Sequence, residues 1–246
     1  MRRLADDNMD SASSVSAATA PDELLARKRV LDARTGATPG FAARLREVRT
    51  WQATRLARTY DDFRTDPQYT RAIEFFLSDL SGPQDFTRRD HDLSFAWTRL
   101  ERTLPQPALN VLTRAIEFEV LTAELDHAIV AQLRPGQLTD ATYAAAYRAV
   151  ANREHRMHQI ELIVGMGREL EWMVRMPGIG LLLQLAHIPA HVAGFGALQD
   201  FLERGFAAFR DVRDTERLLD AIQERETRFM DTLLRSLCRP GGGENA

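Results

Sequence analysis

The chain has 246 residues, of which 44% are hydrophobic and 27% are charged, a composition typical of globular proteins. Its 32 basic and 35 acidic residues give a formal net charge of -3, and this disfavours nucleic-acid binding because proteins of that class carry a basic excess. A single cysteine, Cys238, excludes an internal disulfide and a cysteine zinc site, and it fits a cytoplasmic protein.

Signals for helix starts and stops recur along the chain, whereas the alternating β-branched runs that predict strands are missing. Residues 1–20 show no hydrophobic period and are predicted to be disordered, and the tail at 239–246 is predicted to be flexible. Residues 21–238 are predicted to form a single all-α domain, a bundle of about nine or ten helices. The expected helices lie at 22–34, 41–64, 67–80, 88–103, 107–133, 139–151, 152–174, 179–187, 190–210 and 214–237.

Capping residues and prolines define these boundaries. Asp66 before Pro67, then Thr139 or Asp140, then Asp214 are expected to cap the helices that follow them. Pro189 is expected to separate the helices at 179–187 and 190–210, because proline lacks a backbone N–H donor. The most apolar stretch, residues 179–193, is too short and too polar for a membrane span, so none is predicted.

Charged and polar side chains fall on the apolar faces of three long helices. On a helical wheel, the inward arc contains Glu119 and Asp126 on 107–133, Arg156 and Gln159 on 152–174, and Glu226 on 214–237. His155 on 152–174 and His191 on 190–210 are also expected to turn inward. An isolated buried carboxylate is costly and needs a partner. We therefore expect a buried network of salt bridges and hydrogen bonds that fixes the register of the helices.

The same acids support an alternative. Glu119, Asp126 and Glu226 would hold a metal ion together with His155, as inward-facing Glu and His residues do in metal-binding bundles, and His191 would be an extra ligand. Under this alternative the protein is a metal- or haem-dependent oxidoreductase. The sequence does not identify its cofactor.

Other histidines give weaker metal signals. The Glu-x-x-His pattern that bundle di-metal sites need twice occurs once, at Glu124 and His127, on the polar side of its helix. His187 and His191 are four residues apart, which is the spacing of a two-histidine metal clip. Pro189 is expected to interrupt the helix that this spacing requires.

Residues 75–90 form a motif in which a predicted helix ends at a Gly-Pro turn, and their sequence is FFLSDLSGPQDFTRRD. The motif residues are Asp79, Gly82, Pro83, Asp85, Arg88, Arg89 and Asp90. We expect a structural corner here, with a charged rim around a ligand mouth as the alternative.

This motif resembles the signature of an uncharacterised bacterial protein family, with Ser81 where the family pattern has Tyr. Pieces around Arg156, 198–203 and 225–226 are similar to it as well. The family has no assigned activity, so the resemblance implies an all-helical fold and leaves the function open.

No catalytic constellation emerges from the sequence, whereas apolar surface is plentiful. Small residues at Gly194, Ala197, Gly205 and Ala208 predict close packing between helices, with a groove for an apolar ligand or a dimer contact as the alternative. The sequence favours a non-catalytic module that binds a protein or an apolar small ligand, and a homo-oligomer is the preferred state.

Overall fold

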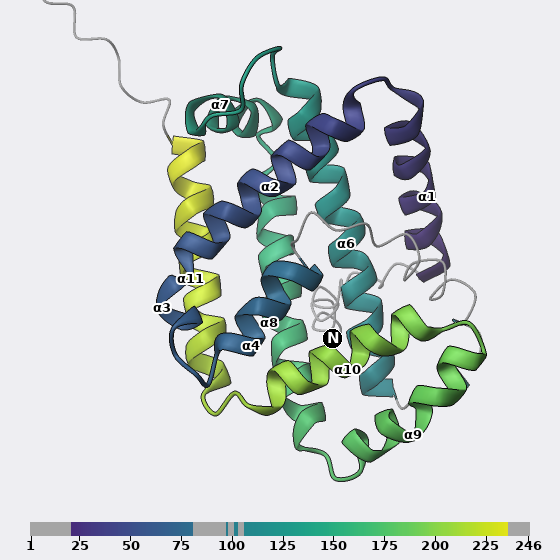
Figure 1. The fold of residues 1–246 in the computed structure, drawn as a ribbon. Coiled ribbons are helices and arrows are strands. Elements are labelled where there is room, and N and C mark those ends of the chain that lie inside the picture. Colours follow the sequence, from purple (N-terminus) through teal and green to yellow (C-terminus); the bar gives the residue numbers. More distant parts are fainter. Residues whose placement is uncertain (1–20, 81–96, 98–100, 103–105, 236–246) are drawn as a thin grey trace, which may run out of the picture.

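The structure is a computed structural model and describes residues 21–80, 97, 101–102 and 106–235 (Figure 1). The expected tails at 1–20 and 239–246, Cys238, and the motif residues from Gly82 to Asp90 lie outside the described residues. Helices make up most of the described part of the chain, and no strand occurs in it, which confirms the all-α class. None of the helices in these ranges is long and apolar enough to cross a membrane.

The elements carry the labels of Figure 1. They are α1 (Pro21–Ala37), α2 (Phe41–Thr59), α3 (Asp61–Arg64), α4 (Thr70–Phe75), the π-helical η1 (Phe76–Leu80), α6 (Gln106–Gln132), α7 (Asp140–Val150), α8 (Arg153–Arg175), α9 (Ile179–Val192), α10 (Gly196–Arg210) and α11 (Thr215–Arg235). Helix α8 packs between α6 and α11, and α2 crosses these long helices near one end. The pair α9 and α10 lies at the opposite end, with α9 on the outside (Figure 1).

Close helix packing depends on glycine at two contacts. A Cβ added at Gly167 on α8 would lie 2.4 Å from Cδ2 of Leu219 on α11. A Cβ added at Gly205 on α10 would lie 3.1 Å from the ring of Phe75 on α4. Gly205 and Ala208 are both buried, so this part of the small-residue arc serves internal packing.

Two predicted caps are confirmed. Thr139 forms a capping box with Thr142 at the start of α7, and Oδ1 of Asp214 accepts a hydrogen bond from the backbone N–H of Arg217 at 3.1 Å. Asp66 instead accepts from the backbone N–H of Gln68 within a turn, so α4 begins later than expected, at Thr70.

The predicted break at Pro189 is wrong. Helix α9 continues through Pro189 to Val192, and the carbonyl of Pro189 accepts a hydrogen bond from the N–H of Ala193 at 3.0 Å. A proline removes one helical donor but keeps its carbonyl as an acceptor. The break occurs at Gly194 instead, whose φ of 86° lies in the left-handed region that ends a helix.

Candidate functional site

Asp126 on α6 is bound by two side chains from α2. Its side chain is 1% exposed and accepts a hydrogen bond from Nε of Arg49 at 3.1 Å and from Nε2 of Gln52 at 3.0 Å. Nε2 of Gln52 also donates to the hydroxyl of Tyr143 at 3.1 Å, and burial raises the pKa of that phenol. The charge of Asp126 is therefore balanced by a guanidinium, and the pair joins α2 to α6.

Glu226 on α11 forms a second ion pair with α2. Nη1 of Arg55 lies 2.7 Å from both carboxylate oxygens, and the hydroxyl of Tyr60 donates to Oε1 at 2.9 Å. Burial, followed by the nearby charge of Glu226, raises the pKa of Tyr60, so the phenol stays protonated and donates. The guanidinium of Arg55 also covers the ring of Phe229, 4.1 Å from its centroid.

Arg156 and Gln159 lie together on α8. Nη1 of Arg156 donates to Oε1 of Gln159 at 3.4 Å, and the guanidinium lies over the ring of Tyr147, 4.7 Å from its centroid. Nε2 of Gln159 donates to Oγ1 of Thr122 on α6 at 2.6 Å. The acids that the sequence expects Arg156 to neutralise have other partners, Arg49 for Asp126 and Arg55 for Glu226.

The four residues of the alternative metal set are not assembled into a site, which corrects that expectation. Glu119 pairs with Lys28 of α1, with Nζ 3.6 Å from Oε1. His155 is exposed in the first turn of α8, where Nδ1 lies 2.5 Å from Oδ1 of Asn152, the residue that caps the helix. A helical wheel gives the face of a residue but neither its level along the bundle nor its neighbour, and each acid here faces a base from α1 or α2.

Asp79 is the one motif residue inside the described ranges. It lies near the end of η1, and its side chain is buried. Its Oδ1 accepts hydrogen bonds from Nε and Nη2 of Arg204 on α10, at 2.9 Å and 2.6 Å. This ion pair links η1 to α10, and the rest of the expected corner lies outside the described residues.

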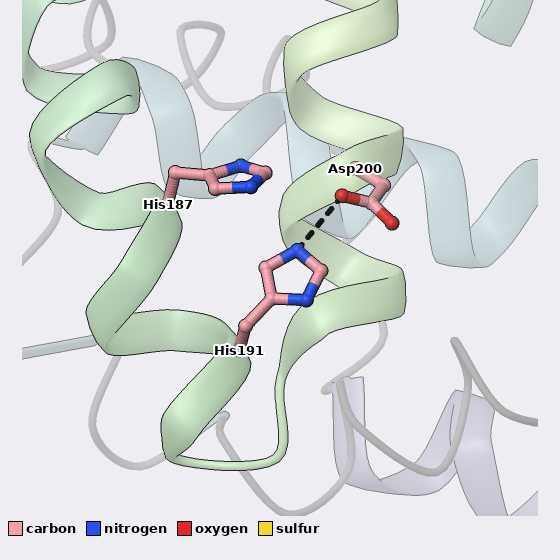
Figure 2. A group of neighbouring side chains, drawn as sticks. All are labelled: His187, His191 and Asp200. Carbon is pink, nitrogen blue, oxygen red and sulfur yellow. Dashed lines mark hydrogen bonds and ion pairs between the residues drawn. The ribbon is translucent and has the colours of Figure 1, made fainter.

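Metal-ligand side chains gather elsewhere, on the pair α9 and α10. Because α9 continues past Pro189, His187 and His191 lie one turn apart, with ring centroids 4.5 Å from each other. Asp200 on α10 faces them (Figure 2), and one ligand atom from each of the three lies within 4.8 Å of the others. Among the described residues this is the group that has the size of a metal site. The side chains of His187, His191 and Asp200 are 44%, 42% and 42% exposed, so the group opens to solvent.

Hydrogen bonds hold the two imidazoles in place. Nε2 of His191 lies 2.9 Å from Oδ1 of Asp200, and Nδ1 of His187 lies 2.9 Å from Oε1 of Glu203. The buried Gln199 donates from Nε2 to Oε1 of Glu203 at 2.8 Å. This hydrogen bond, and next the one from His187, lowers the pKa of Glu203, so the carboxylate is ionised at neutral pH.

In the sequence, the four-residue spacing of His187 and His191 indicates a metal site. The helix break expected at Pro189 argued against this interpretation. No sequence signal marked Asp200 or Glu203. Their approach depends on the turn at Gly194, which folds α10 back along α9.

A different face of α9 presents apolar side chains to solvent. They recur at the spacing of one helix face, and their exposed fractions are 59% for Leu181, 67% for Leu185, 72% for Ile188 and 84% for Val192, with Leu182 beside them at 53%. We call this set the α9 apolar face. The helix contains no Asp, Glu, Lys or Arg, and none of its residues is buried.

An apolar cavity of about 70 Å³ lies among α4, α6, α8, α10 and α11, next to Phe76, Ile163 and Phe201. Pockets that bury drug-sized ligands measure roughly 300–1,000 Å³. The cavity is therefore too small to bind such a molecule.

Comparisons with curated proteins and with solved structures found no match. A family model described as Domain of unknown function (DUF8198) matches residues 32–240, which include every element from α2 to α11. This match confirms the resemblance to an uncharacterised family, and the chain belongs to the DUF8198 domain family.

Proposed function

We propose that this protein is a non-catalytic binding module that self-associates through the α9 apolar face and acts as a homo-oligomer in the cytoplasm. The observation that carries the proposal is the row of Leu181, Leu185, Ile188 and Val192, each more than half exposed on one helix. Contiguous exposed apolar residues are rare on monomers and are typical of protein interfaces.

The composition of α9 favours binding to an apolar protein surface over binding to a membrane surface or to nucleic acid. An interfacial membrane helix and a nucleic-acid-binding helix both use Lys and Arg, and α9 has neither. The cavity of about 70 Å³ is too small for a drug-sized apolar ligand, so the outer surface is the better candidate for binding.

A second copy of the chain is the partner that the surface fits best. An uncharged apolar face is complementary to another uncharged apolar face, and in a two-fold dimer each copy presents the same patch to the other. The five side chains expose on the order of 500 Å² per chain, against about 800 Å² per partner in a standard interface, so the turns flanking α9 would supply the remainder.

Sedimentation equilibrium of the full chain tests the proposal. The wild type should be a dimer at micromolar concentration, and the double variant Leu185→Glu/Ile188→Glu should be a monomer that keeps the helical circular-dichroism spectrum of the wild type. Val30→Glu is the matched control, because Val30 on α1 is an isolated large hydrophobic side chain with 53% exposure. A wild-type chain that stays monomeric at all concentrations, or a Val30→Glu variant that dissociates equally, would contradict the proposal.

A further inference from the structure

We propose that His187, His191 and Asp200 bind a divalent transition-metal ion, with Zn²⁺ as the expected ion, at the solvent-facing end of the α9–α10 pair (Figure 2). Two imidazoles and one carboxylate are ligands that Zn²⁺ prefers, whereas Mg²⁺ and Ca²⁺ take oxygen ligands almost exclusively. The proposal concerns a different face of α9 from the one proposed for self-association.

The distances suit a tetrahedral ion. Ligand bonds of about 2.0–2.2 Å place neighbouring ligand atoms roughly 3.3 Å apart in a tetrahedral site. Nε2 of His191 and Oδ1 of Asp200 are 2.9 Å apart and share a proton in a hydrogen bond, and the three ligand atoms lie within 4.8 Å of one another. An ion bound between His191 and Asp200 would replace this proton, which would pass to solvent. Small rotations of side chains that are partly exposed would complete the geometry, and the fourth position would remain open to water.

The surroundings of His187 match those of a metal-bound histidine. Nδ1 of His187 donates to Glu203, and this fixes the tautomer in which Nε2 has no proton and can bind a metal. A carboxylate on the far nitrogen of a metal-binding histidine orients the ring and raises its basicity. Glu203 is itself oriented by Gln199, which is 6% exposed and also donates to the carbonyl of Leu183 at 2.8 Å.

Gly196 supports the second histidine. A Cβ at this position would lie 2.6 Å from Nδ1 of His191, so the ring occupies the space that only glycine leaves free. An ion bound by ligands from both helices would bridge the turn at Gly194 and fix α9 against α10.

Zinc binding to the metal-free full chain, measured by isothermal titration calorimetry, tests the proposal. We expect one Zn²⁺ per chain, and we expect Co²⁺ at the same site to give the intense visible absorption of tetrahedral coordination. His187→Ala/His191→Ala and Asp200→Asn should abolish saturable binding. His155→Ala is the control, because His155 is an exposed histidine outside the group, and it should bind as the wild type does.

Two further variants test the arrangement without removing a ligand. Glu203→Gln should weaken Zn²⁺ binding by about 10- to 100-fold, the effect typical of losing a carboxylate behind a metal-bound histidine. Gly196→Ala should also weaken binding, because it displaces the ring of His191. Circular-dichroism melting of each variant checks that it is folded.

Absence of saturable Zn²⁺ binding by the folded wild type, or binding retained by His187→Ala/His191→Ala, would overturn the metal site. The dimer-breaking variant Leu185→Glu/Ile188→Glu should still bind one Zn²⁺ per chain. Failure of the metal site and failure of self-association are therefore distinguishable.

Discussion

Replacing Gly167 by alanine sets two effects of one methyl group against each other. Alanine is favoured over glycine in a helix interior by about 1 kcal/mol. The added carbon, however, would lie 2.4 Å from Cδ2 and 3.2 Å from Cδ1 of Leu219. Favourable contacts between carbon atoms lie near 3.5–4.0 Å.

The overlap should dominate. Leu219 is 1% exposed, so it can move only by disturbing its neighbours in the core. Overpacking of this kind costs about 1–3 kcal/mol, and a contact this short falls toward the upper end. After the gain in helix propensity is subtracted, we expect a net loss of about 1–2 kcal/mol in the free energy of unfolding.

Gly165→Ala is the matched control, two residues earlier on α8. A Cβ there would meet only the end of the Arg114 side chain, at 2.9 Å from Nη1, and that flexible end can move away. Urea unfolding followed by circular dichroism should show Gly165→Ala as neutral or stabilised and Gly167→Ala as destabilised. If Gly167→Ala equals or exceeds the wild type in stability, our account of the α8–α11 contact is incorrect.

Three other predictions concern polar groups. Asp126→Ala should lower the free energy of unfolding by about 3 kcal/mol in urea titrations, because it removes the acceptor of the partly buried Arg49. Arg156→Ala should cost less, about 1–2 kcal/mol in the same assay, because Arg156 bonds Gln159 and packs on an aromatic ring. If Arg156→Ala lowers the free energy of unfolding more than Asp126→Ala does, this prediction is wrong. Folding lowers the pKa of Glu203 from 4.5, so the unfolded chain binds the proton of this carboxyl group more tightly than the folded chain does. The ionised Glu203 carboxylate therefore stabilises the folded chain above pH 4.5, and this stabilisation is lost as the pH falls through the pKa of Glu203 in the folded chain. The difference in melting temperature between the metal-free wild type and Glu203→Gln should therefore shrink as the pH falls below 4.5, and a difference that stays constant or grows on acidification would contradict this.

The all-α class and several helix ends were predictable because they depend on local patterns. Thr139 and Asp214 cap helices through hydrogen bonds to residues three positions away, which a sequence displays directly. The wheel also indicated that Asp126 faces inward, and its side chain is 1% exposed. The bases that neutralise the acids were not predictable, because Arg49 and Arg55 reach them across helix contacts that no local pattern encodes.

The spacing of His187 and His191 indicated a metal clip, but the expected helix break at Pro189 argued against it. Pro189 was expected to end the helix because proline lacks a backbone N–H donor. Near the end of the exposed helix α9, however, the loss of this one hydrogen bond does not stop the helix. Asp200 and Glu203 reach the histidines only because Gly194 turns the chain back, and the direction of such a turn is a tertiary property.

Helix α9 contributes no buried side chain to the bundle. Substitutions along it therefore leave the rest of the protein largely intact, and its amide hydrogens should exchange with solvent far sooner than those of α8. Selection acting on this chain is thus free to change the sequence of α9 without lowering the stability of the rest of the bundle.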